Sequence, residues 1–193
     1  MDVNKISDFI KEGAKSLNIY KWDFGASFSN DFSVQIDKGV AKQLKASQKQ
    51  VLTLRVWNDN DLVGITTTSD LSESGLKKAL FQANLASEYG NKNEKTDFSP
   101  LSKDPIKLLN TKKINPSGIK KLLTVLRIAE TKLLKKHEAI KSIPYNGLSE
   151  SFFKRVYANS DGASRSFENS QAALYLYARA EEKDKKPRSS GAV

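Results

Sequence analysis

The stretch "VLTLRVWNDNDLVGITTTSDLSESGLKKAL", residues 51–80, decides the fold, because its hydrophobic period changes partway along. It starts with two runs rich in β-branched residues, and the turn residues "NDND" at 58–61 between them predict an antiparallel hairpin. It ends with helical spacing: Asp70 or Ser72 can cap the helix, and Glu73 stands three residues after Asp70, in capping-box register. The stretch therefore predicts a sheet with a helix packed on one face.

The residues before this stretch continue the same pattern. Extended runs at 22–37, 39–47 and 50–57 are separated by turn chemistry, including "DKG" at 37–39, and predict a meander of three or four antiparallel strands. A helix that ends near Asn18 is predicted ahead of them, because apolar residues recur there at helical spacing: Ile6, Phe9, Ile10, Ala14 and Leu17.

The residues after this stretch predict one more helix and a second group of strands. The first predicted helix after the hairpin ends at Gly90, and residues 91–105 form a polar loop. A further helix is expected with Asn115 as its N-cap and Pro116 in its first turn. Extended runs follow at 148–159, 162–182 and 189–193. This order predicts an α+β fold, a mostly antiparallel sheet with helices packed on one face.

The amino-acid composition limits the classes of protein to which this chain can belong. A chain of 193 residues can bury a core as a single domain, and its lack of cysteine excludes disulfides and thiolate zinc sites. No run approaches the roughly 18 apolar residues of a membrane span, and the amino terminus does not read as a secretory signal. We therefore expect a soluble, cytoplasmic protein with no membrane partner.

The positive charge is concentrated in one segment. The formal net charge is +10, and residues 112–141 contribute nine Lys or Arg against two Glu. This segment is typical either of a nucleic-acid-binding module, using Lys120, Arg127 and Lys135, or of the solvated face of an amphipathic helix. The helix face is favoured, because no aromatic platform for bases accompanies the charge.

His137 is the only histidine and the first candidate metal ligand. "HEAIK" begins like a zinc-protease motif, but Lys141 stands where that motif has its second histidine, and its ammonium group would repel a metal ion. His137 is therefore predicted to be a helix-end residue near the negative end of the dipole. Asp59 and Asp61 lack the remaining ligands of a calcium loop and are predicted turn residues.

Two further motifs combine polar groups with tight turns. In "NSDG", residues 159–162, Ser160 and Asp161 are a candidate nucleophile and carboxylate, but no base is identified beside them, and a turn is the favoured interpretation. In "NPSGIKK", residues 115–121, a helix start with lysines is typical of an anion site, yet the glycine pattern of a nucleotide loop is missing. Helix capping is therefore favoured.

Two stretches together point to a family. Residues 51–80 and "VYANSDGASRSFENSQAALYLYARAEE", residues 156–182, resemble the TldD/PmbA family, also called modulator of DNA gyrase, and are more similar to its PmbA/TldE branch. The resemblance implies an N-terminal α/β domain at 1–182, and at 183–193 the start of the connection to a C-terminal β-rich domain that is missing here.

The resemblance also implies a function. TldD-type subunits are metallopeptidases whose zinc histidines lie in a His-Glu-x-x-x-His helix, and the PmbA/TldE-type subunit lacks these ligands. Ser142 stands at the position of the second histidine after His137. No catalytic, cofactor-binding or metal residue is therefore assigned, and zinc is expected only in a TldD-like partner. The expected partners are a TldD-like subunit or further copies of the chain, with peptide substrate reached through the assembly and no activity of the chain alone.

Overall fold

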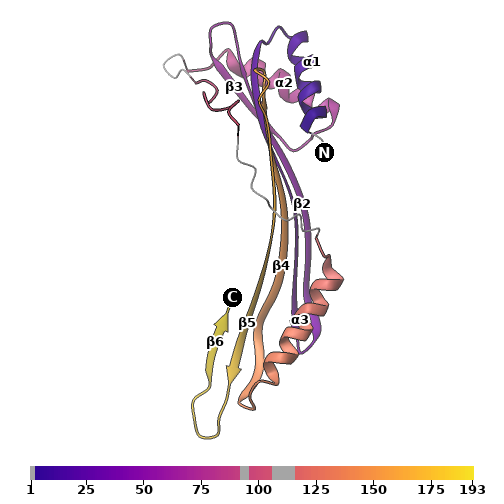
Figure 1. Ribbon diagram of the computed structural model, residues 1–193, viewed down its shortest axis with the longest axis vertical. Helices are drawn as coiled ribbons and strands as arrows, with labels where there is room; N and C mark the ends of the chain where they lie inside the picture. Colours follow the sequence, from indigo (N-terminus) through magenta and orange to yellow (C-terminus); the bar gives the residue numbers. More distant parts are fainter. Residues whose placement is uncertain (1–2, 92–95, 106–115) are drawn as a thin grey trace. The chain divides into compact units, whose positions relative to one another are not determined.

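The computed structural model describes residues 3–91, 96–105 and 116–193. Its strands form one six-stranded sheet in the order β3-β2-β1-β4-β5-β6, and the pairs β2–β3 and β5–β6 are antiparallel (Figure 1). The predicted α+β class is confirmed. The elements are α1 (Val3–Ser16), β1 (Lys21–Asp37), β2 (Val40–Trp57), β3 (Val63–Thr68), α2 (Glu73–Ser87), α3 (Ile119–Leu134), β4 (Ile140–Asn159), β5 (Ser164–Ala180) and β6 (Arg188–Ala192).

The chain divides into two compact units, and the long strands contribute to both. Unit 1 contains residues 1–28, 49–111 and 154–168, and unit 2 contains residues 29–48, 112–153 and 169–193. The predicted boundary after residue 182 stays a prediction. Among the described residues, no helix is long and apolar enough to cross a membrane.

Unit 1 has a core between α1, α2 and one face of the strands. From α1, the predicted residues Ile6, Ile10 and Ala14 are buried, and they pack against apolar residues of β1, β2 and β4. The helix α2 lies so close to β3 that an added Cβ at Gly64 would stand 1.8 Å from the carbonyl oxygen of Ala83. A glycine is therefore required at this contact.

The turn and the helix start predicted in residues 51–80 are confirmed, but the capping-box register of Asp70 and Glu73 is not, because Glu73 directly follows the N-cap. Ser72 is the N-cap of α2, and its hydroxyl accepts a hydrogen bond from the N–H of Gly75. At the β2–β3 turn, the Oδ1 atom of Asn58 accepts hydrogen bonds from the N–H groups of Asn60 and Leu62. Both features depend on side chains that bond to neighbouring backbone, which the sequence alone reveals.

Residues 40–57 form one strand, which decides between the three and the four strands predicted for the meander. The expected interruption near residues 48–49 does not occur, so the meander has three strands, β1, β2 and β3. The turn between β1 and β2 lies where "DKG" predicts it, with Lys38 at φ 49° and Gly39 at φ 78°. Polar residues at 47–50 suit an exposed strand as well as a turn, and the period alone does not separate the two.

In unit 2, α3 packs its apolar face onto Val34, Ile36 and Leu148 of the sheet. The helix begins later than predicted: its N-cap is Gly118, with φ 77°, and Pro116 precedes the helix, while Asn115 lies outside the described residues. The cause is a contact with β4. The backbone N–H and the hydroxyl of Ser117 donate to the two carboxylate oxygens of Glu150, at 2.6 and 3.2 Å.

Candidate functional site

A buried carboxylate in unit 1 is the centre of the candidate site. Asp23 of β1 is 2% exposed, and Arg55 of the neighbouring strand β2 donates two hydrogen bonds to it, from Nε to Oδ1 at 2.8 Å and from Nη2 to Oδ2. The hydroxyl of Tyr157, on β4, donates to the same Oδ2 at 3.1 Å. Three adjacent strands thus converge on one acidic side chain.

The charges of this cluster stabilise one another. The hydrogen bonds that Arg55 donates to Asp23 raise the pKa of Arg55 against the opposing effect of burial, so the guanidinium stays charged. Burial, and secondly the charge of Asp23, raise the pKa of Tyr157, so its hydroxyl remains protonated and keeps donating. Both oxygens of Asp23 thus accept hydrogen bonds from side chains of the neighbouring strands.

A chain segment packs beside this cluster. Trp57 donates from Nε1 to the carbonyl oxygen of Thr96 at 3.0 Å, and its ring meets Phe98 edge-on, with centroids 5.1 Å apart. The ammonium group of Lys21 lies 5.1 Å from the Trp57 ring centroid and 2.8 Å from Asp97. The hydrogen bond from Lys21 lowers the pKa of Asp97. The predicted loop is irregular here, and these contacts hold its residues 96–98 on unit 1.

A shallow, mainly apolar depression lies beside Tyr157. Its volume is about 630 Å³. Gly25 is one of its lining residues, and a Cβ added to Gly25 would meet nothing within 4 Å. Its walls come from β2, β4 and β5 and include Val51, Tyr157, Arg165 and Phe167. The hydrogen bond to Asp23 therefore holds the Tyr157 side chain at the edge of this depression.

The "NSDG" corner is the turn between β4 and β5. Asn159 accepts at Oδ1 from the N–H of Ala163 at 2.9 Å, and Gly162 has φ 90°. The Oγ atom of Ser160 accepts from the N–H of Trp22 at 3.3 Å, and the N–H of Ser160 donates to the carbonyl of Trp22 at 2.8 Å. These bonds join Ser160 to the backbone of β1 and support the interpretation of residues 159–162 as a turn.

His137 does not lie in a metal-binding helix. It follows the end of α3, and its Nδ1 atom accepts a hydrogen bond from the N–H of Ala139 at 3.1 Å. The next residues enter β4 at Ile140, so Ser142 lies on a strand. Asp59 and Asp61 are exposed turn residues. Within residues 3–91, 96–105 and 116–193, no group of three His, Cys, Asp or Glu could hold a metal ion.

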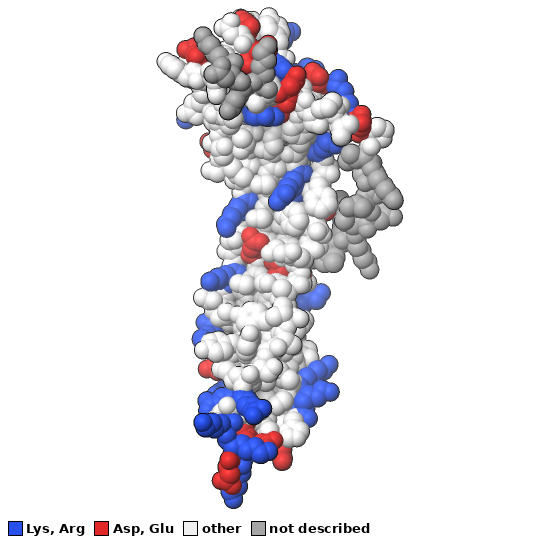
Figure 2. Space-filling model, turned by 90° about the vertical axis from the view of Figure 1, so that its left-hand side faces the viewer, with Lys and Arg blue, Asp and Glu red and all other residues white. Residues whose placement is uncertain are grey.

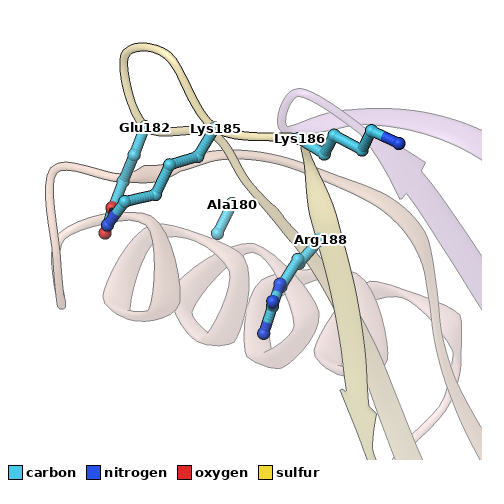
Figure 3. A pocket seen from close by; sticks show the side chains of 5 residues that line it. All are labelled: Ala180, Glu182, Lys185, Lys186 and Arg188. Carbon is cyan, nitrogen blue, oxygen red and sulfur yellow. Dashed lines mark hydrogen bonds and ion pairs between the residues drawn. The ribbon is translucent and has the colours of Figure 1, made fainter.

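Basic residues occupy two exposed surfaces of unit 2. On α3 the three basic residues predicted for the solvated face are exposed: Lys120, Arg127 and Lys135. Figure 2 shows further Lys and Arg side chains gathered over the β5–β6 turn. Beneath that turn lies a hollow of about 590 Å³, lined in part by Lys185, Lys186 and Arg188 (Figure 3). Lys185 bonds to Glu182, which neutralises part of this charge.

The Asp23 cluster is absent from the sequence-based candidates. Arg55 is separated from Asp23 by 32 residues, and only the pairing of β1 with β2 brings them together. One signal was available: "WDF" at 22–24 places a carboxylate between two aromatic residues in a predicted strand. A buried acid needs a cationic partner, and Arg55 lies in the next strand along the chain.

Comparisons with known proteins give the same fold. A solved structure from Thermotoga maritima, described as a candidate modulator of a DNA gyrase, is 16% identical with a TM-score of 0.77, covering 98% of this chain and 42% of that chain. TldE from Thermococcus kodakarensis is 16% identical with a TM-score of 0.71, over 96% of this chain and 42% of that chain. A further candidate gyrase modulator, from Bacteroides thetaiotaomicron, is 13% identical with a TM-score of 0.72, over 97% of this chain and 43% of that chain.

Two family models match the chain itself. The model described as PmbA/TldA metallopeptidase domain 1 matches residues 22–85, and the PmbA/TldA metallopeptidase central domain matches residues 112–193. No curated protein matches. The chain belongs to the TldD/PmbA family. It spans less than half the length of the solved structures that it resembles.

Proposed function

We propose that the chain is the non-catalytic N-terminal part of a PmbA/TldE-like subunit, which works with a TldD-type metallopeptidase in peptide processing. The observation that carries this proposal is the pair of family matches, which assign residues 22–85 and 112–193 to domain 1 and the central domain of a metallopeptidase. The likeness in fold to TldE favours the PmbA/TldE branch.

The segment around His137 supports a non-catalytic role. A His-Glu-x-x-x-His zinc motif needs both histidines on one helix, but here residues 137–139 form a turn and Ser142 lies on β4. In this proposal the TldD-like subunit supplies zinc and the reaction, and this chain supplies contact surface. The assembly would act in the cytoplasm, and the region after residue 182 would lead toward a β-rich domain.

A reconstitution assay tests this proposal. Hydrolysis of a quenched fluorescent peptide is measured with this chain alone, with a TldD-like subunit alone, and with both together. We expect no hydrolysis by the chain alone and a higher rate with both than with the TldD-like subunit alone. Zinc-dependent hydrolysis by the purified chain, or no effect on the TldD-like subunit at any ratio, would contradict the proposal.

Nucleic acid remains the alternative partner, and the basic face of α3 is the surface to test. Arg127 donates from Nε to the carbonyl of Gly39 at 2.8 Å, so part of this face serves the fold of unit 2. Binding of duplex DNA that weakens steeply with salt and is lost in Lys120→Gln/Lys135→Gln would favour this alternative. We expect no such binding.

A further inference from the structure

The outer side of β2 in unit 2 is an open sheet edge. β3 pairs with β2 only from Leu52 to Trp57, and β1 lies on the other side of β2. Within the part of the chain that the structure describes, no strand pairs with the outer side of residues 40–48 (Figure 1). Alternate N–H and C=O groups along an edge strand point outward and can form a ladder with another extended chain.

The side chains of this edge are exposed on both faces of the strand. Every residue from 40 to 48 is exposed, including Val40 at 69% and Leu44 at 48%. A strand with one face on a core shows alternating burial, as β2 does from Leu52 onward. Residues 40–48 therefore offer apolar side chains as well as backbone groups to an incoming strand.

All charged side chains of this edge are positive. Lys42 and Lys45 lie within residues 40–48, and the segment contains no acidic residue. Opposite charges on neighbouring strands stabilise pairing, while like charges destabilise it. Two paired copies of this edge would carry two lysines on each face, so self-pairing is disfavoured and an acidic strand is favoured.

We propose that residues 40–48 of β2 bind an extended acidic segment of a partner protein by strand addition. Backbone hydrogen bonds supply the pairing, while Lys42 and Lys45, which lie on opposite faces of the strand, select acidic side chains on both faces of the incoming segment. This inference goes beyond the proposed function, because it concerns a surface of unit 2 and requires neither zinc nor a TldD-like subunit.

The test uses the full chain and a fluorescein-labelled peptide of Glu-Glu-Val-Val repeats, which carries glutamate on both faces of an extended chain and whose length matches residues 40–48. Binding is measured by fluorescence anisotropy, and amide protection by hydrogen exchange. We expect protection at residues 40–48. The double variant Lys42→Glu/Lys45→Glu should weaken binding about tenfold, because it replaces two attractive pairs by repulsive ones.

Two controls separate strand addition from general attraction. The variant Lys120→Glu/Lys135→Glu makes the same change of charge on the exposed face of α3 and should leave the affinity unchanged. A peptide with alternate N-methylated amides keeps the side chains but loses ladder donors, and it should not bind. Equal weakening by both double variants, or equal binding of the methylated peptide, would overturn the proposal.

A second copy of the chain is the other occupant to be tested. Sedimentation velocity over a range of concentrations, without peptide, reports self-association. We expect the backbone amides of residues 40–48 to exchange hydrogen at the same rate at all concentrations of the chain. Protection of these residues that rises with concentration, and persists in Lys120→Glu/Lys135→Glu, would assign the edge to pairing between copies and overturn the acidic partner.

Discussion

Arg55 donates two hydrogen bonds to the carboxylate of Asp23, and the side chains of the two residues differ in solvent exposure. The Asp23 side chain is 3% exposed, while that of Arg55 is 32% exposed. The Arg55 guanidinium also lies 5.1 Å from the ring centroid of Trp57. The pair thus joins β1 to β2 and adjoins the Trp57 contacts of residues 96–98.

Removing only the positive charge of Arg55 should lower the stability of the folded chain. In Arg55→Met the buried carboxylate of Asp23 keeps the Tyr157 hydroxyl but loses its counter-charge, so the free energy of unfolding should fall by about 3 kcal/mol. Urea denaturation measures this change. The double variant Asp23→Leu/Arg55→Met removes both charges and should recover part of the loss. A loss below about 1 kcal/mol in the single variant would contradict a buried, paired carboxylate.

The stability that Tyr157 contributes should depend on pH in one direction. Its pKa is raised above the ordinary value of 10.0 in the folded chain, so the folded state holds the phenolic proton more tightly than the unfolded state. This contribution is complete below pH about 10 and is lost as the pH rises through the folded pKa. Chemical denaturation of the wild type and Tyr157→Phe should therefore show a difference that shrinks in alkali. A difference in stability between the two proteins that stays constant with pH would contradict a raised pKa of Tyr157.

The close contact between α2 and β3 can be tested with two glycines. Gly64→Ala places a methyl group against the backbone of Ala83 and Ser87, and should destabilise the chain by about 3 kcal/mol or more. Gly25→Ala is the matched control, since its methyl group meets nothing within 4 Å. Thermal unfolding of both variants gives the comparison. Similar melting temperatures would show that α2 does not approach β3 as described.

The packing of residues 96–98 on Trp57 should depend on one aromatic contact. Phe98→Ala removes the edge-on partner of Trp57, so amide exchange in residues 96–105 should quicken and Trp57 fluorescence should shift to the red. Leu101→Ala is the control from the same segment, because Leu101 is 67% exposed. Equal exchange in the two variants would mean that Phe98 does not anchor the segment.

Features encoded by neighbouring residues were predictable from the sequence. Ser72 caps α2 through Gly75, and Asn58 closes its own turn, because each bonds to backbone a few residues away. The start of α3 was not predictable, because Ser117 bonds to Glu150, which is distant in sequence. The Asp23–Arg55 pair was missed for the same reason, since it requires the register of two strands.

Native mass spectrometry with and without a TldD-like subunit tests the central claim most directly. We predict a complex that contains this chain and the TldD-like subunit, with zinc bound only to the latter. Zinc on the isolated chain would contradict the non-catalytic assignment. Failure of the chain to join the TldD-like subunit would contradict its proposed role in the assembly.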